Sequence, residues 1–384
     1  MTDEAIRRRR IWKLVYPAAR AFCRLRYHLT LDPITAERPY LLIANHTTNF
    51  LDILLVAFAA GKEPLYFIGS EHILRSGWTG RLLQWAFGLI ARPKGAPAMS
   101  TVRDTIKTLK AGIPVCLFAE GNASWDGRNV PVVEGTGSLV RASGVPLVTY
   151  RLEGSYLCRP RWSRSFRRGT IRGRQIRVCF PDELREMSSA GINSLIEQDI
   201  REDVWERQKR EMQSLPGRHR AEYLERLLYL CPSCRQIGTL HSRGDRLACS
   251  CGASWRYTEK AFLEPSRPFP DLAQWEDWEK KQIRSRDFIR NDDGSLFSDS
   301  GCALSRILKE HRESQLGTGD LILDEQALTC AGHRFEMTDI REMDMVRHHI
   351  LLFTAGDGYY QIRAEGQANL RKYLEIWKQK REAL

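Results

Sequence analysis

The stretch Ala44-Asn45-His46-Thr47-Thr48-Asn49-Phe50-Leu51-Asp52 decides how the first half of the chain is interpreted. It follows a short apolar run, residues 40–43, that is typical of a buried strand. It precedes a second apolar run, residues 53–60, that predicts a core helix ending at Gly61. The sequence therefore places a histidine at the end of a strand and an aspartate at the start of the next helix.

His46 and Asp52 are the residue types from which a general base is built. A helix N-terminus favours a negative charge, as on the carboxylate of Asp52. A carboxylate that accepts the proton of one imidazole nitrogen leaves the other nitrogen basic. Asp52 alone could also be a simple helix cap, so the pair is interpreted together with its surroundings.

Three more blocks follow in order, each beside a predicted strand: Gly88-Leu89-Ile90-Ala91-Arg92-Pro93-Lys94, Phe118-Ala119-Glu120-Gly121-Asn122-Ala123-Ser124 and Gly144-Val145-Pro146-Leu147-Val148. Strands and helices alternate over this region, which predicts a layered α/β domain with its site at the strand ends. The four blocks resemble the glycerophospholipid acyltransferase superfamily, whose best-known members are the 1-acylglycerol-3-phosphate acyltransferases. We assign residues 1–215 to this acyltransferase domain.

The resemblance implies an O-acyltransferase of phospholipid synthesis. Its donor would be a fatty acyl thioester on coenzyme A or acyl carrier protein, or an acyl phosphate, and its acceptor a lysophospholipid such as lysophosphatidate. His46 would be the catalytic base and Asp52 its partner. Arg92 and Lys94 would hold the acceptor phosphate, and Glu120 and Gly121 would shape the acceptor pocket.

The sequence departs from the family pattern at two places. Five residues separate His46 from Asp52, where the commonest form of the family has four. Ala119 replaces a proline, and Ala123 stands where the family has an arginine that helps to bind the acceptor phosphate. Arg128 is a nearby alternative cation. These differences keep glycerol 3-phosphate, or another lipid hydroxyl, open as the acceptor.

Four cysteines farther along have the spacing of metal ligands. Cys231 and Cys234 form one pair, and Cys249 and Cys251 form a second pair after fourteen intervening residues. Two thiolate pairs suit tetrahedral Zn²⁺ in a closed, structural site. The segment resembles a zinc ribbon, assigned to residues 228–260, and His241 is expected at its surface.

The last part of the chain, residues 300–384, is predicted to be mostly β. Short alternating runs between residues 321 and 362 are separated by turn residues, and a final helix carries Leu370, Tyr373, Leu374 and Trp377 on one face. Strands followed by a C-terminal helix resemble a pleckstrin-homology-like domain.

The charge and hydropathy of the chain bear on its partners. The 384 residues carry a net charge of +12, so anionic partners are expected. No apolar run is long enough to span a bilayer, and the N-terminus lacks the features of a signal peptide. We therefore expect a cytoplasmic protein bound peripherally to the anionic inner face of the cell membrane. Nucleic acid is the rival partner, in a zinc-ribbon module that binds nucleic acid or protein, but this would leave the four blocks unexplained.

Two segments are candidate membrane contacts. An apolar stripe near the N-terminus predicts either an interfacial helix or an ordinary packed helix, with Pro17 bending it or starting a second helix: Ile11, Leu14, Val15, Ala18, Ala19 and Phe22. Residues 159–177 contain eight arginines and no acid. They could face a membrane, an acidic carrier, nucleic acid or simply solvent.

Other local patterns predict helices. Thr101 and Asp104 resemble a capping box at the start of a helix. Residues 78–87 and 192–212 are each expected to form one helix.

Overall fold

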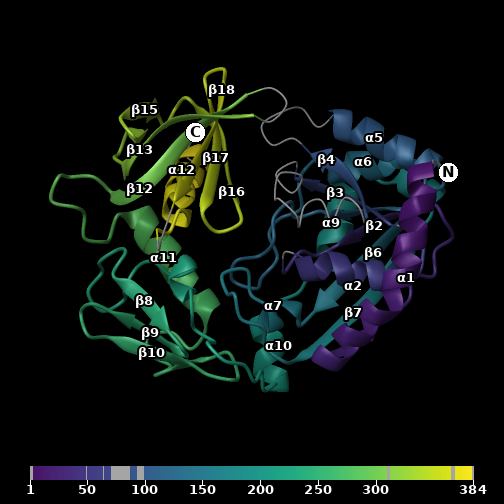
Figure 1. Cartoon of the computed structure of the whole chain (residues 1–384), viewed down its shortest axis with the longest axis horizontal. Helices are drawn as coiled ribbons and strands as arrows, with labels where there is room; N and C mark the ends of the chain where they lie inside the picture. The colour runs from purple at the N-terminus through teal and green to yellow at the C-terminus, as the bar shows by residue number, and fades with distance from the viewer. Residues whose placement is uncertain are drawn as a thin grey trace. The chain divides into compact units, whose positions relative to one another are not determined.

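The chain divides into two units in a computed structural model (Figure 1). The first comprises Met1–Arg161 and Phe166–Pro216, and the second comprises Trp162–Ser165 and Gly217–Leu384. The structure describes residues 3–48, 50–63, 65–70, 87–92, 99–308, 312–364 and 368–382. Lys94 and almost all of the helix expected at 78–87 lie outside these residues.

A seven-stranded sheet forms the centre of the first unit, in the order β1-β7-β6-β2-β5-β3-β4. The strands are β1 (His28–Leu31), β2 (Leu41–Ala44), β3 (Tyr66–Ser70), β4 (Gly88–Arg92), β5 (Val115–Phe118), β6 (Leu147–Glu153) and β7 (Thr170–Cys179). Strands β6, β2, β5, β3 and β4 are parallel to one another, whereas β7 runs antiparallel to β6. The carboxyl ends of these five parallel strands consequently meet at one edge of the sheet.

Helices accompany this sheet, as the alternating pattern predicts: α1 (Asp3–Arg26), α2 (Phe50–Ala60), α5 (Met99–Lys110), α6 (Thr136–Ser143), α7 (Ser155–Cys158), α8 (Pro181–Glu186), α9 (Ser189–Asp199) and α10 (Val204–Glu211). One buried apolar cluster joins β2 and β5 to α5, α6 and α9, and includes Leu41, Leu109, Leu139 and Ile196. The predicted α/β class is confirmed.

Two helix predictions are wrong in detail. Helix α5 already includes Met99, so Thr101 lies inside it, and its hydroxyl donates to the carbonyl of Ala91 at 3.0 Å instead of capping the helix. The single helix expected at 192–212 is two helices. The side chain of Asp203 accepts hydrogen bonds from the backbone N–H groups of Trp205 and Glu206, which caps and starts α10.

Helix α1 packs on its domain by one face and leaves the predicted apolar stripe largely outside. Trp12 and Tyr16 are buried; Trp12 donates to the carbonyl of Gly61 at 2.8 Å and stacks on Phe58. Leu14 and Phe22 are 80% and 66% exposed. The helix continues through Pro17, so no second helix starts there.

The second unit contains two antiparallel sheets. The smaller has the order β11-β10-β9-β8, with β8 (Leu240–Arg243), β9 (Arg246–Cys249), β10 (Ser254–Tyr257) and β11 (Leu263–Glu264). The larger has the order β15-β14-β13-β12-β18-β17-β16, with β12 (Phe297–Ile307), β13 (Glu313–Leu323), β14 (Ala327–Cys330), β15 (His333–Glu336), β16 (Ile340–Val346), β17 (Ile350–Ala355) and β18 (Gly358–Ala364).

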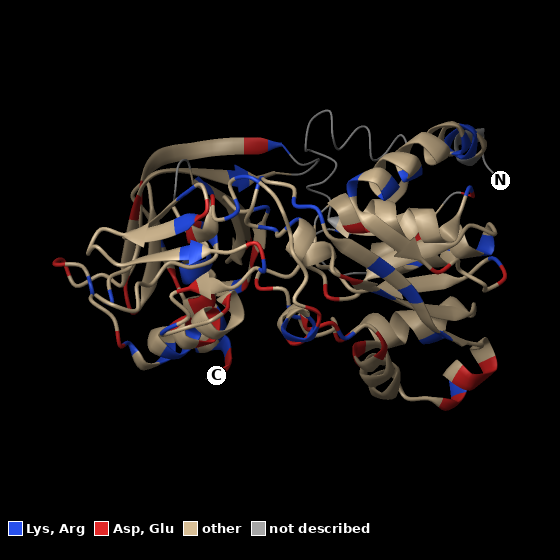
Figure 2. Ribbon diagram, turned by 90° about the horizontal axis from the view of Figure 1, so that it is seen from below, with Lys and Arg blue, Asp and Glu red and all other residues tan. Residues whose placement is uncertain are grey.

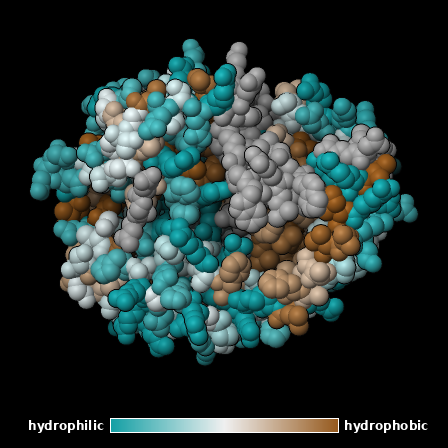
Figure 3. Space-filling view, viewed as in Figure 1, coloured by the Kyte–Doolittle hydropathy of each residue, from teal (hydrophilic) through white to brown (hydrophobic). Residues whose placement is uncertain are grey.

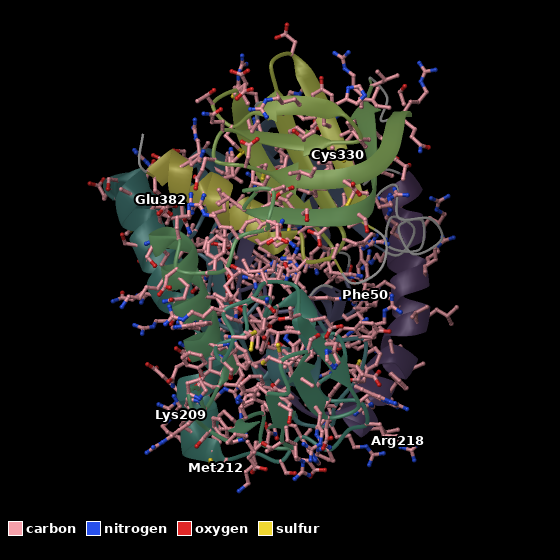
Figure 4. All side chains as sticks on the ribbon, turned by 90° about the vertical axis from the view of Figure 1, so that its left-hand side faces the viewer. Phe50, Lys209, Met212, Arg218, Cys330 and Glu382 are labelled. Atoms are coloured by element: carbon pink, nitrogen blue, oxygen red, sulfur yellow. The ribbon has the colours of Figure 1, made fainter. Side chains whose placement is uncertain are left out.

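Three helical segments complete the second unit: η1 (Leu224–Arg226), α11 (Leu272–Ser285) and the terminal α12 (Arg371–Glu382). Figure 4 labels Cys330 in the larger sheet and Glu382 near the end of α12. The predicted mostly-β region with a terminal helix is therefore confirmed.

The arginine-rich segment 159–177 does not form one surface. Arg161 and Arg167 are buried, at 8% and 0% exposure, and the carboxylates of Glu211 and Asp199 pair with Arg172 and Arg177. Part of the charge of this run is therefore buried or paired with carboxylates inside the fold. No helix in the described residues is long and apolar enough to cross a membrane.

Candidate active site and metal centre

The carboxyl edge of the first sheet brings together residues that are far apart in sequence. His46 lies two residues after β2, Glu120 lies two residues after β5, and Arg92 is the last residue of β4. Ala44 of β2 is paired with Phe118 of β5, which places the two following loops side by side. An edge of parallel strand ends is the usual place for a site in such sheets.

His46 and Asp52 form a hydrogen-bonded pair at this edge. His46 Nδ1 lies 3.0 Å from Asp52 Oδ2. A carboxylate can only accept, so Nδ1 carries the proton and Nε2 is left with a free lone pair. The imidazole is 17% exposed while the Asp52 side chain is fully buried. The arrangement can therefore take a proton from a group that reaches the ring.

Asp52 is held by several donors besides the imidazole. The backbone N–H groups of Thr47 and Thr48 each donate to Asp52 Oδ2 at 2.7 Å, and the Thr48 hydroxyl donates to Oδ1 at 3.0 Å. The backbone N–H of Asp52 donates in return to the Thr48 hydroxyl at 3.2 Å. Asp52 is thus both part of the helix start and the fixed partner of His46.

Glu120 supports His46 from the neighbouring strand. Its Oε1 accepts from the backbone N–H of His46 at 2.9 Å and from the Asn129 side chain at 2.8 Å, and its Oε2 accepts from the backbone N–H of Val130 at 2.8 Å. Burial raises the pKa of Glu120 to about 7, against the opposing effect of these donors. The carboxyl group therefore positions the loop that carries the histidine.

Four residues that we did not select from the sequence complete the support. Asn45 is fully buried and exchanges two hydrogen bonds with the backbone of Leu152, at 2.8 and 2.7 Å. The Phe118 ring stacks on the His46 ring with centroids 4.4 Å apart. The hydroxyl groups of Thr47 and Ser155 lie 2.6 Å apart. Asn45 and Phe118 occur in the quoted blocks, so their positions were a usable signal, but nothing in the sequence indicated Ser155.

The candidate phosphate-binding residues are partly described. The Cβ of any residue larger than glycine at position 121 would lie 3.6 Å from Arg92 Nη1, which places the guanidinium beside Gly121. Gly121 has φ +71°, a conformation that side-chain-bearing residues avoid. Arg128 donates to Asp126 Oδ2 at 2.6 Å and is thereby engaged locally. The backbone carbonyl of Ala123 accepts a hydrogen bond from Arg161 Nη1 at 2.8 Å.

The four selected cysteines of the second unit converge. All four sulfur atoms lie within 4.8 Å of one another. The Sγ atoms of Cys231 and Cys251 are 3.9 Å apart, and those of Cys234 and Cys249 are 3.7 Å apart. Zn–S bonds of ~2.3 Å in a tetrahedron require sulfurs ~3.8 Å apart. The cluster therefore fits Zn²⁺, and these distances exclude disulfides. His241 is exposed on β8, as expected.

Comparison with known proteins identifies one part of the chain. Residues 26–153 match the family model described as Acyltransferase, which confirms the family resemblance for this segment. A solved structure described as the 1-acyl-sn-glycerophosphate (LPA) acyltransferase, PlsC, from Thermotoga maritima is similar at 21% sequence identity and a TM-score of 0.42. That similarity covers 52% of this chain and 80% of that chain.

Proposed function

We propose that the acyltransferase domain at residues 26–153 moves a fatty acyl group from an acyl thioester to the hydroxyl of a lysophospholipid such as lysophosphatidate. The observation that carries the proposal is the His46–Asp52 pair at the carboxyl edge of a parallel sheet. The donor would be acyl coenzyme A or acyl-acyl carrier protein, and the reaction would serve phospholipid synthesis.

His46 Nε2 takes the proton from the acceptor hydroxyl while its oxygen attacks the thioester carbonyl. Asp52 holds the Nδ1–H tautomer and stabilises the imidazolium that forms. When the tetrahedral intermediate collapses, the C–S bond breaks and His46 returns the proton to the departing thiolate. The products are an ester and a free thiol, and the protein ends in its starting protonation state.

Arg92, together with Lys94, binds the acceptor phosphate in this proposal. A guanidinium suits a phosphate because its donors match the phosphate oxygens in pairs. Ala123 offers no cation, and Arg128 is paired with Asp126. Glycerol 3-phosphate is therefore a second candidate acceptor, since its recognition would also depend on the phosphate and a neighbouring hydroxyl. Glu120 and Gly121 shape the acceptor side through the loop after β5.

The test is acyl transfer by purified protein over a panel of acceptors that includes lysophosphatidate and glycerol 3-phosphate, with products identified by mass. His46→Ala should lower turnover by about 10²–10⁴-fold, the usual contribution of a general base. The matched control is His241→Ala, which removes an exposed histidine of the second unit. Turnover of a folded His46→Ala protein within threefold of wild type would rule out the mechanism.

The second unit carries one structural Zn²⁺ in this proposal, held by Cys231, Cys234, Cys249 and Cys251. Four thiolates leave no open position on the metal, so it would stabilise the fold and take no part in acyl transfer. Elemental analysis of protein purified without added metal should give one zinc per chain. Cys249→Ser should lose it and Cys302→Ser, at a buried cysteine of β12, should keep it. Protein that contains no zinc contradicts the assignment.

The same proposal includes peripheral binding to an anionic membrane through α1. The acceptor is a membrane lipid, and the helix exposes apolar side chains beside basic ones. Binding at the inner face of the cell membrane would bring the acyltransferase domain to its acceptor.

A further inference from the structure

A group of basic side chains in the second unit has no role in the proposed reaction. It contains Arg164 from segment 162–165, Arg226 from η1, and His349 at the turn between β16 and β17. The aromatic ring of Tyr223, the residue before η1, lies among them. We call these residues, with Arg347 and Arg363, the basic cluster. Four stretches of the chain contribute to it, since Arg363 belongs to β18.

Tyr223 is the centre of the cluster. The guanidinium carbon of Arg226 lies 3.9 Å from the centroid of the Tyr223 ring, and that of Arg164 lies 4.8 Å from it. Arg164 Nη1 also donates to the Tyr223 hydroxyl at 3.3 Å. Two guanidiniums thus contact one aromatic ring. Their positive charges repel each other, and an anion between or beside them would offset this repulsion.

Arg226 is buried without an acidic partner. It is 8% exposed, and its described hydrogen bond is a long one, 3.4 Å, to the carbonyl of Trp162. Among the described residues no ion pair joins Arg226 or Arg164 to a carboxylate within 4.0 Å. The neighbouring acid, Glu225, accepts a hydrogen bond from the Ser242 hydroxyl. Burial of a charge without a partner is costly, so such a group is usually kept for a ligand.

The turn between β16 and β17 adds to the positive field. His349 is half-buried, and its Nδ1 is buried without a hydrogen-bond partner among the described residues. Burial, and then the charges of Arg347, Arg363, Arg226 and Arg164, lower the pKa of His349. Arg226 likewise has a pKa lowered to about 10 by burial and by Arg164, against the opposing effects of Tyr223 and Glu225. Arg363 is also paired with Glu313 at 3.7 Å, so Arg164 and Arg226 are the guanidiniums that remain without an ion pair beside Tyr223 among the described residues.

We propose that the basic cluster binds a phosphate monoester dianion, with Arg164 and Arg226 as its principal donors and Tyr223 as the platform that orients them. A dianion suits this place better than a carboxylate, because two guanidiniums, those of Arg164 and Arg226, contact the same ring and neither forms an ion pair with a carboxylate among the described residues. The phosphate belongs either to a lipid headgroup or to a soluble phosphorylated compound. The site is made of residues of the second unit, whereas Arg92 belongs to the first unit.

The test uses full-length, zinc-loaded protein carrying Arg92→Gln and Lys94→Gln, so that neither cation of the proposed acceptor site can bind phosphate. Calorimetric titration with inorganic phosphate should show saturable binding. Arg164→Gln and Arg226→Gln should each weaken it about tenfold or more, the value expected for one charge-assisted hydrogen bond. Arg246→Gln, the same charge change at an exposed position of β9, should leave it unchanged. Absence of saturable binding, or equal binding by all three variants, overturns the proposal.

Two further measurements separate a ligand-binding role from a structural one and identify the source of the phosphate. Without phosphate, Arg226→Gln should melt at or above the temperature of the parent protein, because it removes an unpaired buried charge; a clear loss of stability would overturn the assignment. Vesicles of phosphatidylcholine containing phosphatidate provide the lipid arm. Weaker vesicle binding by Arg164→Gln than by Arg246→Gln assigns the site to a headgroup, and equal vesicle binding with weakened phosphate binding assigns it to a soluble phosphate.

Discussion

Asp52 shows how one side chain can define both a local structure and a reaction. Its carboxylate accepts from two backbone N–H groups, from Thr48 and from His46, so its rotamer is fixed before any substrate arrives. A sequence pattern could predict the His46–Asp52 pair because both members lie in one short stretch. It could not predict that Glu120 supports His46, since two of the donors that this carboxylate meets are backbone N–H groups, one from the loop after β2 and one from farther along its own loop.

Replacement of Glu120 by glutamine should impair the site although the shape is kept. The carboxylate accepts three hydrogen bonds, and an amide has one oxygen to accept them. The NH₂ group would meet another donor, the backbone N–H of Val130 or of His46, and leave it buried and unsatisfied at a cost of about 1–3 kcal/mol. We expect turnover to fall about tenfold or more and the melting temperature to fall as well. Wild-type kinetics in Glu120→Gln would show that this carboxyl group does not position His46.

The pH dependence of stability offers a control for this prediction. The pKa of Glu120 is raised by burial from an ordinary 4.5 to about 7. A raised pKa means that the contribution of the group to stability is present below pH 4.5 and is lost as the pH rises through about 7. The stability of Glu120→Gln should lack this pH-dependent contribution. Glu120→Asp should keep a titrating carboxyl group, but its shorter side chain would place that group farther from the backbone N–H of His46. Equal pH profiles for wild type and Glu120→Gln would contradict the assignment of the raised pKa.

At the scale of elements, the sequence predicted most strands and helices but not how charged residues fasten them together. Helix α12 begins with Arg371, which is 3% exposed, donates to the carbonyl of Leu227 at 2.9 Å and pairs with Glu276 of α11. Burial alone would raise the pKa of Glu276, but Arg371 and Lys280 outweigh it and hold the pKa at about 2. The apolar face of α12 was visible in the sequence. The ion pair beneath it was not, because a charged residue next to an apolar stripe usually faces solvent.

Breaking this pair should destabilise the second unit strongly. Arg371→Met leaves the carboxylate of Glu276 buried without its guanidinium, which costs about 3–5 kcal/mol. Arg371→Met combined with Glu276→Met removes both charges and should recover much of that loss. Urea unfolding of zinc-loaded protein at pH 7 gives the four free energies of this double-mutant cycle. Additive losses in the double variant would mean that the two side chains do not stabilise the fold as a pair.

At the scale of the whole molecule, each unit carries its own candidate site. Residues Trp162–Ser165 belong to the second unit, the chain then returns to the first unit from Phe166 to Pro216, and the rest of the second unit follows. Composition predicted an anionic partner from the net charge of +12, but it could not say where the charge lies. In the structure, α1 is a better candidate than the arginine-rich segment for contact with an anionic partner. Lys and Arg occur along this helix near the N-terminus in Figure 2.

The outer face of α1 is the surface through which we expect the protein to bind a membrane. Hydrophobic side chains gather over this helix in Figure 3. Leu14, Phe22 and Leu25 are 80%, 66% and 87% exposed. At 100° per residue, Leu14 and Leu25 lie opposite the buried Trp12 and Tyr16, and Phe22 lies on the side of the helix between these two faces. Arg10 and Arg24 are exposed at the border of this strip. Apolar insertion and attraction to anionic headgroups would therefore act on the same face.

Substitution of this strip should weaken membrane binding without unfolding the domain. Leu14→Gln, Phe22→Gln and Leu25→Gln together remove apolar side chains worth up to about 1.5–3 kcal/mol each on burial, and Arg10→Gln with Arg24→Gln removes about 1 kcal/mol per charge near an anionic surface. We expect the triple variant to sediment with anionic vesicles at least tenfold more weakly than wild type. The charge variant should lose the preference for anionic over neutral vesicles and much of the sensitivity to salt.

Substitution is a sharper test than deletion of the helix, because Trp12 and Tyr16 pack on Phe58 and their loss would disturb the core of the first unit. Met99→Gln is the matched control, since it removes a side chain that is 74% exposed on α5. It should leave vesicle binding unchanged. If the triple variant binds vesicles as wild type does, the apolar strip is not the contact. If wild type binds neutral and anionic vesicles equally at low salt, the basic residues of α1 do not contribute, and attraction to headgroups is not what brings the protein to a membrane.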